Sequence, residues 1–196
     1  MAGHPDLAAR SNDAAQRATL RVVGALSFML YTTVGAYVAI PIPPFGVPMT
    51  LQTLAVVLAA VCLGPKVGTA SMALYLVAGM VGVPLYADGN AGLGVILGQT
   101  GGYLVGFVAC QPVVAWLMRG PGGLPRGWGE FALAVVAAHA VIFLIGVPWL
   151  AIVRGIDLWT AAKGGMLPFL PGMVVKCAIA VLIGRLALPW CTRNIW

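Results

Sequence analysis

Lys176 is the residue with the clearest chemical potential, because it carries the only charge inside a long apolar run. That run covers residues 164–184 and reads GGMLPFLPGMVVKCAIAVLIG. A lysine at membrane depth costs at least about 2.5–3.5 kcal/mol, so it usually faces a bundle interior, a water-filled cavity or a ligand. In such a setting its ammonium group can pair with an anionic group. The alternative is a lysine near a helix start whose ammonium group extends to the membrane interface.

Further hydrogen-bonding side chains gather around two glycine-rich segments. Asp88 and Asn90 lie in the first segment, residues 88–94, and Gln99, Thr100 and Tyr103 lie in the second, residues 94–106. Polar groups are costly to leave unpaired in lipid. We therefore expect these side chains to line a pocket.

Small residues recur at a spacing of four, which places them on one helix face where a second helix backbone can approach closely. The clearest series consists of Gly94, Gly98, Gly102 and Gly106. Simple helix packing is one interpretation of this series, and room for a ligand at its upper turns is the other. Gly35 and Ala39 have the same spacing. They are a candidate docking face for another membrane subunit, or they serve internal packing.

The sequence lacks the common motifs of catalysis and metal binding. It contains no G-x-x-x-x-G-K-[ST], H-E-x-x-H or G-x-S-x-G, so it has no P-loop for ATP hydrolysis. Its four cysteines show no C-x-x-C spacing, which argues against a disulfide framework or a zinc site. His139 stands alone in an apolar run, where helix packing is its more common role. We predict a protein that is not an enzyme and that holds no metal or cofactor.

The composition is that of an integral membrane protein. Of the 196 residues, 61% are hydrophobic and 8% are charged, and the mean hydropathy is +0.98. Soluble domains average about 25% charged residues. The net charge of +6 does not indicate a nucleic-acid partner, because the basic residues are spread between the apolar runs and at the termini.

The apolar runs predict an all-α bundle of six transmembrane helices, since a bilayer core needs about 20 helical residues. The expected spans are residues 22–40, 50–63, 67–85, 93–118, 131–153 and 172–189. Prolines separate the first two spans, and Lys66 marks the turn after the second, which is short enough to be tilted or partly re-entrant. Residues 1–21 are expected to form a mobile cytoplasmic tail, residues 22–193 one membrane domain, and residues 194–196 the C-terminal end.

The distribution of basic residues predicts that both termini are cytoplasmic. This orientation leaves only Arg154 and Lys163 outside and puts eight basic residues inside. The eight are Arg10, Arg17, Arg21, Lys66, Arg119, Arg126, Arg185 and Arg193. The outer side then carries the loop at 41–48, the segment 88–94, the connection 155–171 and the start of the last helix. We expect a pocket that opens to the outside among these segments.

Five segments of the sequence, in this order, resemble the BioY family, the biotin-specific substrate-binding components of energy-coupling-factor transporters. They read PMTLQTL (48–54), LGPKVG (63–68), GLG (92–94), LGQTGGYLVGF (97–107) and PFLPG (168–172), followed by Lys176. The resemblance extends from about Val22 to Ala187. The combination of T-G-G-Y-x-x-G-F with P-F-x-P-G is its most specific part.

The resemblance implies a six-helix protein of a prokaryotic cytoplasmic membrane that captures biotin from outside. It also implies delivery with help from an energy-coupling transmembrane subunit and two ATPase subunits, although some family members are thought to work without a dedicated coupling module. Two other functions stay open. The chain could bind another small vitamin, or it could be a scaffold in which Lys176 pairs with a partner chain.

One position departs from the family pattern. The P-F-x-P-G segment is usually followed by aspartate, and here Met173 stands in that place. An aspartate would accept hydrogen bonds from the N–H groups of biotin's ureido ring. Gln52, Asp88 or Asn90 could supply such an acceptor instead.

A site for biotin should be mostly apolar with a few aimed polar groups, because the ligand joins an apolar bicycle to a ureido group and a carboxylate. We expect Lys176 to pair with the carboxylate. Asn90, together with Gln99 or Thr100, is expected to hydrogen-bond the ureido group. The expected flat walls are Tyr86, Tyr103 and Trp149.

Overall fold

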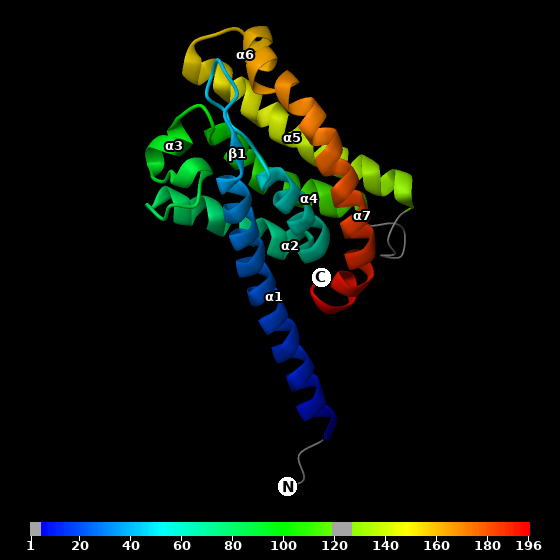
Figure 1. Ribbon diagram of the computed structural model, residues 1–196. Coiled ribbons are helices and arrows are strands. Elements are labelled where there is room, and N and C mark those ends of the chain that lie inside the picture. Colours follow the sequence, from blue (N-terminus) through cyan, green and yellow to red (C-terminus); the bar gives the residue numbers. More distant parts are fainter. Residues whose placement is uncertain (1–4, 119–126) are drawn as a thin grey trace.

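The computed structural model describes residues 5–118 and 127–196, with only the backbone described for residues 5–11, and it is built almost entirely from helices (Figure 1). The elements, in chain order, are α1 (Pro5–Tyr37), β1 (Ala39–Ile40), β2 (Met49–Thr50), α2 (Gln52–Met80), the 3-10 turn η1 (Ala87–Gly89), α3 (Leu93–Leu97), α4 (Gly101–Met118), α5 (Trp128–Arg154), α6 (Leu158–Gly165), the 3-10 turn η3 (Leu167–Phe169) and α7 (Leu170–Asn194). Arg119 and Arg126, which entered the predicted topology, lie outside the described residues.

Five helical stretches of the described chain are long and apolar enough to cross a membrane. They are Asn12–Tyr37, Gln52–Met80, Gly101–Met118, Trp128–Arg154 and Leu158–Asn194. The second stretch is α2, which is interrupted at Gly64 and so contains two helical limbs. When both limbs are counted, each of the six predicted spans has a helical counterpart. The prediction of an all-α, multi-pass membrane protein is confirmed.

The interruption in α2 follows from its sequence. Pro65 has no backbone N–H to donate to the preceding turn, and a proline disfavours the helical conformation of the residue before it. That residue is Gly64, which adopts φ 72° and ψ −177°, a conformation that glycine tolerates best. The carbonyl oxygens of Val61 and Cys62 then accept hydrogen bonds from the Trp196 indole, each at 3.2 Å.

The first helix differs from its prediction at both ends. α1 begins at Pro5, so the segment expected to be a mobile tail is helical from there on. Alanines such as Ala14, Ala15 and Ala18 favour this extension, because alanine has the highest helix propensity. At its other end α1 stops at Tyr37, and Ala39 lies in β1, which pairs antiparallel with β2.

The fourth predicted span, expected as one helix over residues 93–118, is broken. α3 ends at Leu97, Gly98 is extended with φ −79° and ψ −172°, and α4 starts at Gly101. Gly94 and Gly98 therefore do not share a helix face with Gly102 and Gly106. The glycine series predicted close packing correctly only for its second half.

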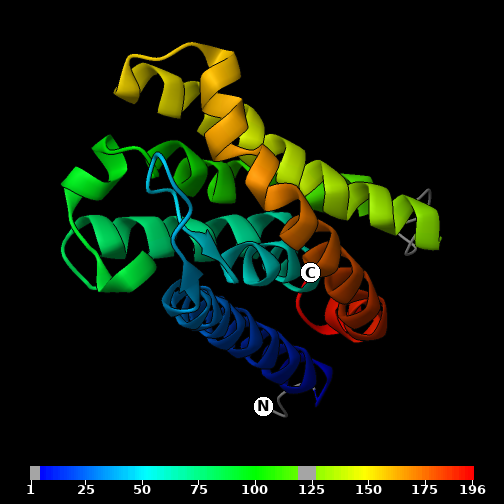
Figure 2. The same cartoon turned by 45° about the horizontal axis from the view of Figure 1, so that its top comes forward.

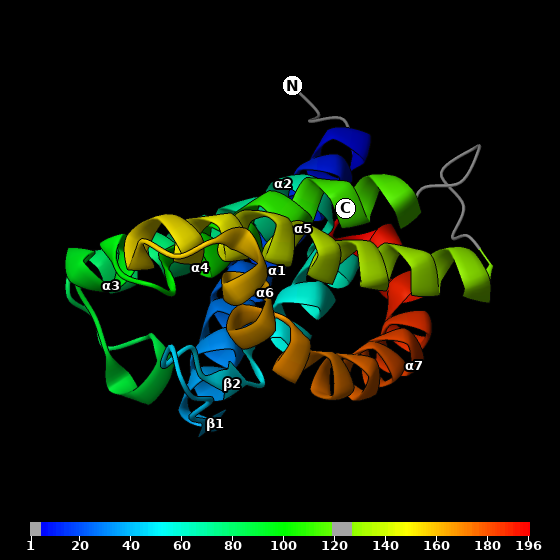
Figure 3. The same ribbon diagram turned by 90° about the horizontal axis from the view of Figure 1, so that it is seen from above.

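Gly102 and Gly106 let α4 lie directly against α5. A Cβ added to Gly102 would fall 2.3 Å from the Cβ of Trp149, and one added to Gly106 would fall 2.9 Å from the Cα of Ile142. Gly146 of α5 does the same for Tyr103, whose ring atom Cδ1 lies 2.4 Å from the position of an added Cβ. In Figure 3 the two helices run side by side along one side of the molecule.

The C-terminal end of the chain lies at one end of the bundle, against the middle of α1, and the N-terminal part of α1 extends beyond it (Figure 1). The Arg21 side chain donates hydrogen bonds to the carbonyl oxygens of Ile195 at 2.8 Å and Trp196 at 3.3 Å. At the opposite end are α6 and the loop between β1 and β2 (Figures 1 and 2). Phe45 of that loop packs against Gly164 of α6. This arrangement puts both termini on the same side, in agreement with the predicted topology.

Large apolar side chains cover much of the outer surface. Ile152, Leu186 and Leu144 are 80%, 77% and 73% exposed, whereas a soluble monomer rarely exposes wide apolar patches. Lipid tails are the solvent that such a surface requires. The buried centre is formed largely around α2, which packs against α1, α4 and α7.

Candidate ligand-binding site

A cavity of about 490 Å³ opens among the segments at the α6 end of the bundle. Its walls come from the β1–β2 loop, the start of α2, the η1 segment, the α3–α4 link, α5, η3 and α7. Small-molecule sites typically measure about 300–1,000 Å³ and are mostly apolar. The predicted pocket is therefore present, and the three connections expected to surround it contribute to its walls.

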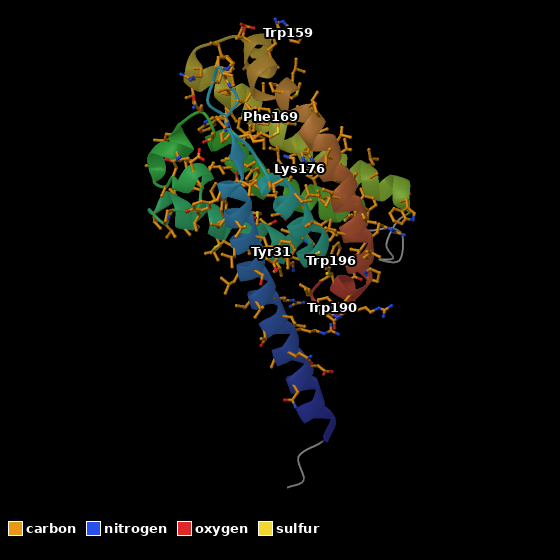
Figure 4. The ribbon with its side chains drawn as sticks, in the orientation of Figure 1. Tyr31, Trp159, Phe169, Lys176, Trp190 and Trp196 are labelled. Carbon is orange, nitrogen blue, oxygen red and sulfur yellow. The ribbon has the colours of Figure 1, made fainter. Side chains whose placement is uncertain are left out.

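Lys176 lines this cavity from α7 and is 7% exposed (Figure 4). Its Nζ donates a hydrogen bond to the backbone carbonyl of Thr50 at 3.1 Å. The ammonium group has three donors, so two of its N–H groups have no acceptor within residues 5–118 and 127–196 and are available to a ligand. The alternative in which the side chain extends to the membrane interface is wrong.

A chain of buried hydrogen bonds extends from Thr50 into the bundle. The Thr50 hydroxyl donates to Gln52 Oε1 at 2.9 Å, and Gln52 Nε2 donates to the Tyr75 hydroxyl at 2.6 Å. The Tyr75 hydroxyl donates in turn to the Leu85 carbonyl at 2.9 Å. Gln52 thus lines the cavity with its amide already engaged. Its side chain holds β2, α2 and the segment before η1 together.

Two of the three predicted aromatic walls are in place. Tyr86 and Tyr103 both line the cavity and are 1% and 8% exposed. Their hydroxyls donate to backbone carbonyls, that of Tyr86 to Leu76 at 2.5 Å and that of Tyr103 to Gly165 at 2.9 Å. Burial raises the pKa of Tyr86 to about 12, so it stays a neutral donor. Both residues can offer a ligand the faces of their rings.

Trp149, the third predicted wall, is not among the cavity-lining residues. Its indole Nε1 donates to the carbonyl oxygen of Gly98 at 2.9 Å. The same carbonyl accepts from the Gly101 backbone N–H at 3.2 Å, in the link between α3 and α4. Trp149 therefore supports the cavity wall from behind.

The remaining predicted polar residues lie around the cavity at different depths. Asp88 and Asn90 are exposed, and Gln99 and Thr100 are half-buried in the α3–α4 link. Asn90 Nδ2 donates to the carbonyl of Ala87 at 2.8 Å, which leaves its amide oxygen available. Met173 lines the cavity one turn before Lys176 and presents a thioether where a carboxylate was weighed.

The candidate docking pair does not form one helix face. Ala39 lies beyond the end of α1, and Gly35 packs inward on the start of α2. A Cβ at Gly35 would lie 2.9 Å from the backbone N of Gln52. Internal packing, one of the two interpretations of this spacing, is what the structure gives for Gly35, and docking at this pair stays a prediction.

His139 and Thr53 are cavity residues that the sequence predictions did not select. His139 is 2% exposed and lines the cavity from α5, although a lone histidine favoured a packing role. Thr53 lines it from the first turn of α2. The only available signal was a polar side chain within an apolar span, and that signal does not give the direction in which the side chain points.

Comparisons with known proteins bear on the family and the fold of this chain. A model of the BioY family matches residues 9–193. The probable biotin transporter BioY of Pyrococcus horikoshii is 38% identical over 158 residues, covering 81% of this chain and 90% of the relative. The biotin transporter BioY of Rhodobacter capsulatus is 35% identical, covering 80% and 86%. That of Thermotoga maritima is 34% identical, covering 80% and 88%.

A solved structure shares the fold. The 2.1 Å crystal structure of the S-component for biotin from an ECF-type ABC transporter aligns with a TM-score of 0.79 and 23% identity. The alignment covers 94% of this chain and 93% of that one. The family model covers nearly the whole chain, and several relatives exceed 30% identity over most of it. On this basis, the chain belongs to the BioY family.

Proposed function

We propose that this chain is the biotin-binding component of an energy-coupling-factor transporter in a prokaryotic cytoplasmic membrane. Residues 22–193 form its membrane domain, and biotin enters the cavity from the outer side. A transmembrane coupling subunit and two ATPase subunits then drive import. Relatives named as biotin transporters support this proposal, as does the fold shared with the S-component for biotin.

The observation that carries the proposal is a buried lysine at the wall of a cavity large enough for a vitamin. Lys176 has two N–H groups free, because its contact with Thr50 uses one. In a partly dehydrated site the effective dielectric constant is low, so the attraction between the ammonium group and an electronegative ligand atom is stronger than in water. We assign Tyr86 and Tyr103 as the aromatic walls of the cavity that contact the ligand.

The other residues that we assign to ligand binding have distinct roles. Gln99, Thr100, Asn90 and Asp88 supply hydrogen-bonding groups at the cavity walls, and Met173 supplies an apolar contact. Gln52 and Trp149 act indirectly, the first through Thr50 and the second through Gly98.

Calorimetry on the detergent-purified chain tests the proposal. We expect biotin to bind, and Lys176→Ala to weaken binding at least about tenfold, as expected for a lost hydrogen bond to a charged group. Lys163→Ala is the matched control, because Lys163 is exposed on α6 and does not line the cavity. Its affinity should equal that of the unchanged chain.

The outcomes separate the other functions. If biotin fails to bind while another vitamin in a panel does, the chain serves that vitamin. If no small molecule binds, a scaffold role remains, and Lys176 should then be found against a carboxylate of a partner chain. Equal affinities of the unchanged chain and Lys176→Ala would remove the lysine from the site.

A further inference from the structure

Two buried polar atoms at the cavity have no hydrogen-bond partner among the residues that the structure describes. They are Nε2 of His139 and Oγ1 of Thr53, and both residues line the cavity together with Lys176. The exposed fraction of His139 is 2%, so the residue is 98% buried. A buried polar atom without a partner costs about 1–3 kcal/mol. Such atoms inside a cavity indicate a ligand that completes them.

The hydrogen bond of the other ring nitrogen, Nδ1, determines whether His139 Nε2 is a donor or an acceptor. Its Nδ1 lies 3.1 Å from the carbonyl oxygen of Val135, one turn earlier on α5. A carbonyl oxygen only accepts, so Nδ1 carries the proton, and Nε2 of the neutral ring is then an acceptor. Cys177 Sγ, 3.6 Å from Nδ1, places the ring beside the turn of α7 that carries Lys176.

The lining of this cavity therefore presents complementary groups from α7, α5 and the first turn of α2. Lys176 supplies N–H donors, His139 supplies a neutral acceptor, and the Thr53 hydroxyl can do either. A carboxylate, which only accepts, would meet an unfavourable lone pair at His139. A cyclic urea or amide fits both, because its C=O and N–H groups are on adjacent atoms.

We infer that His139 Nε2 is a specificity-determining acceptor that binds a ureido N–H of the ligand, while Lys176 donates to the adjacent carbonyl. This inference rests on the proposed function. Lys176 then contacts the ureido group of the ligand, whereas the sequence led us to expect a contact with the carboxylate. It also supplies an acceptor on α5, where Met173 of α7 offers none.

Nitrogen-15 NMR of the histidine ring tests the inference on the unchanged site. The chain has two histidines, so His4→Ala with labelled histidine leaves the His139 signals alone. The free protein should show Nδ1 protonated and Nε2 unprotonated. Saturating biotin should shift the Nε2 signal in the direction of an accepted hydrogen bond and leave Nδ1 nearly unmoved. A protonated Nε2 in the free protein, or an Nε2 signal that biotin does not move, overturns the inference.

Binding measurements add a second readout. His139→Leu removes the acceptor at similar volume and should weaken biotin at least about tenfold, whereas His139→Gln, with an amide oxygen near the same position, should retain most of the affinity. Biotin amide, which lacks the carboxylate charge but keeps the ureido group, should lose as much affinity on Lys176→Ala as biotin does. If Lys176→Ala weakens biotin but not biotin amide, Lys176 pairs with the carboxylate and the inference is wrong. If His139→Leu does not fold, the NMR result decides.

Failure of the inference and failure of the proposed function look different. Biotin binding that needs Lys176 but ignores His139 overturns the inference alone. A chain that does not bind biotin at all overturns both.

Discussion

Two of the predicted spans are interrupted, one at Gly64 and one at Gly98. A tryptophan indole contacts the backbone at each interruption, but the two interruptions have different surroundings. At Gly64 the carbonyls of Val61 and Cys62 accept from the Trp196 indole. In the α3–α4 link the Gly98 carbonyl accepts from the Trp149 indole as well as from the Gly101 N–H. A backbone carbonyl cannot stay unpaired in lipid. Tryptophan provides an N–H together with a large apolar body, so it satisfies the carbonyl without adding a charge.

The difference lies in what surrounds each break. At Gly64, the indole of Trp196 lies on the glycine itself, about 3.0 Å from where a Cβ would be, and no residue from 54 to 85 lines the cavity. At Gly98, the indole lies behind the link, and Gly98, Gln99 and Thr100 all line the cavity. One break turns the chain. The other places irregular backbone and its side chains at the wall of the cavity.

The largest effect is expected when one methyl group is added beside a break, as in a glycine-to-alanine substitution. A Cβ on Gly101 would fall 1.7 Å from the carbonyl oxygen of Ile96, so Gly101→Ala must displace the link that lines the cavity. We expect biotin affinity to fall at least about tenfold and the free energy of unfolding to fall by about 1–3 kcal/mol. Calorimetry and thermal unfolding in detergent measure the two quantities.

Gly64→Ala is the matched variant at the other break. Its backbone, at φ 72° and ψ −177°, lies in a region that costs an alanine about 1–3 kcal/mol, so stability should fall while biotin affinity stays unchanged. If Gly64→Ala weakens biotin as much as Gly101→Ala does, the two breaks are coupled and the contrast between them is wrong.

Removing each indole N–H should have a smaller effect. Trp196→Phe leaves the carbonyls of Val61 and Cys62 unpaired and should cost about 1–3 kcal/mol of stability without a change in affinity. Trp149→Phe should cost less stability, because the Gly98 carbonyl keeps its bond from the Gly101 N–H, but it should weaken biotin, because the α3–α4 link loses its hydrogen bond to α5. Circular dichroism during heating follows stability without relying on tryptophan emission. Equal affinities of the two variants would contradict the assignment of Trp149.

The smallest effect is expected from single polar side chains beside the breaks. Gln99→Ala should weaken biotin by about threefold to tenfold, the value of one hydrogen bond between neutral groups. Lys66→Ala, which changes an exposed residue directly after the Gly64 break, should leave biotin affinity unchanged. A Gln99 variant with full affinity would restrict the ligand to the Lys176 side of the cavity.

Much of the fold follows from local sequence signals. Apolar runs, prolines and Lys66 predicted six spans and the turn near Gly64, because length and charge largely decide what can cross a bilayer. The break at Gly98 could not be predicted in this way. Its partner, Trp149, is 51 residues away in the sequence, and the glycine spacing alone is equally compatible with a straight helix.

The residues of the site were also predicted only in part, because contacts between distant segments decide which side chains reach the cavity. Lys176, Tyr86 and Tyr103 line the cavity as expected, and Trp149 does not. His139 was passed over because a lone histidine carries no local signal of direction. Its importance depends on which nitrogen contacts the Val135 carbonyl within α5 and on the cavity that the other nitrogen faces, which exists only once α5 has packed with the other helices.

The placement of the tryptophans gives the protein two built-in fluorescent reporters. Trp116, Trp128, Trp159 and Trp190 are 55–73% exposed, so their emission senses lipid or detergent. Trp149 and Trp196 are half-buried with their indole N–H groups bonded. Once the four exposed tryptophans are replaced by phenylalanine, the emission that remains comes from the two breaks alone. Quenching it from the membrane and titrating it with ligand would observe the backbone of a transporter at two known points.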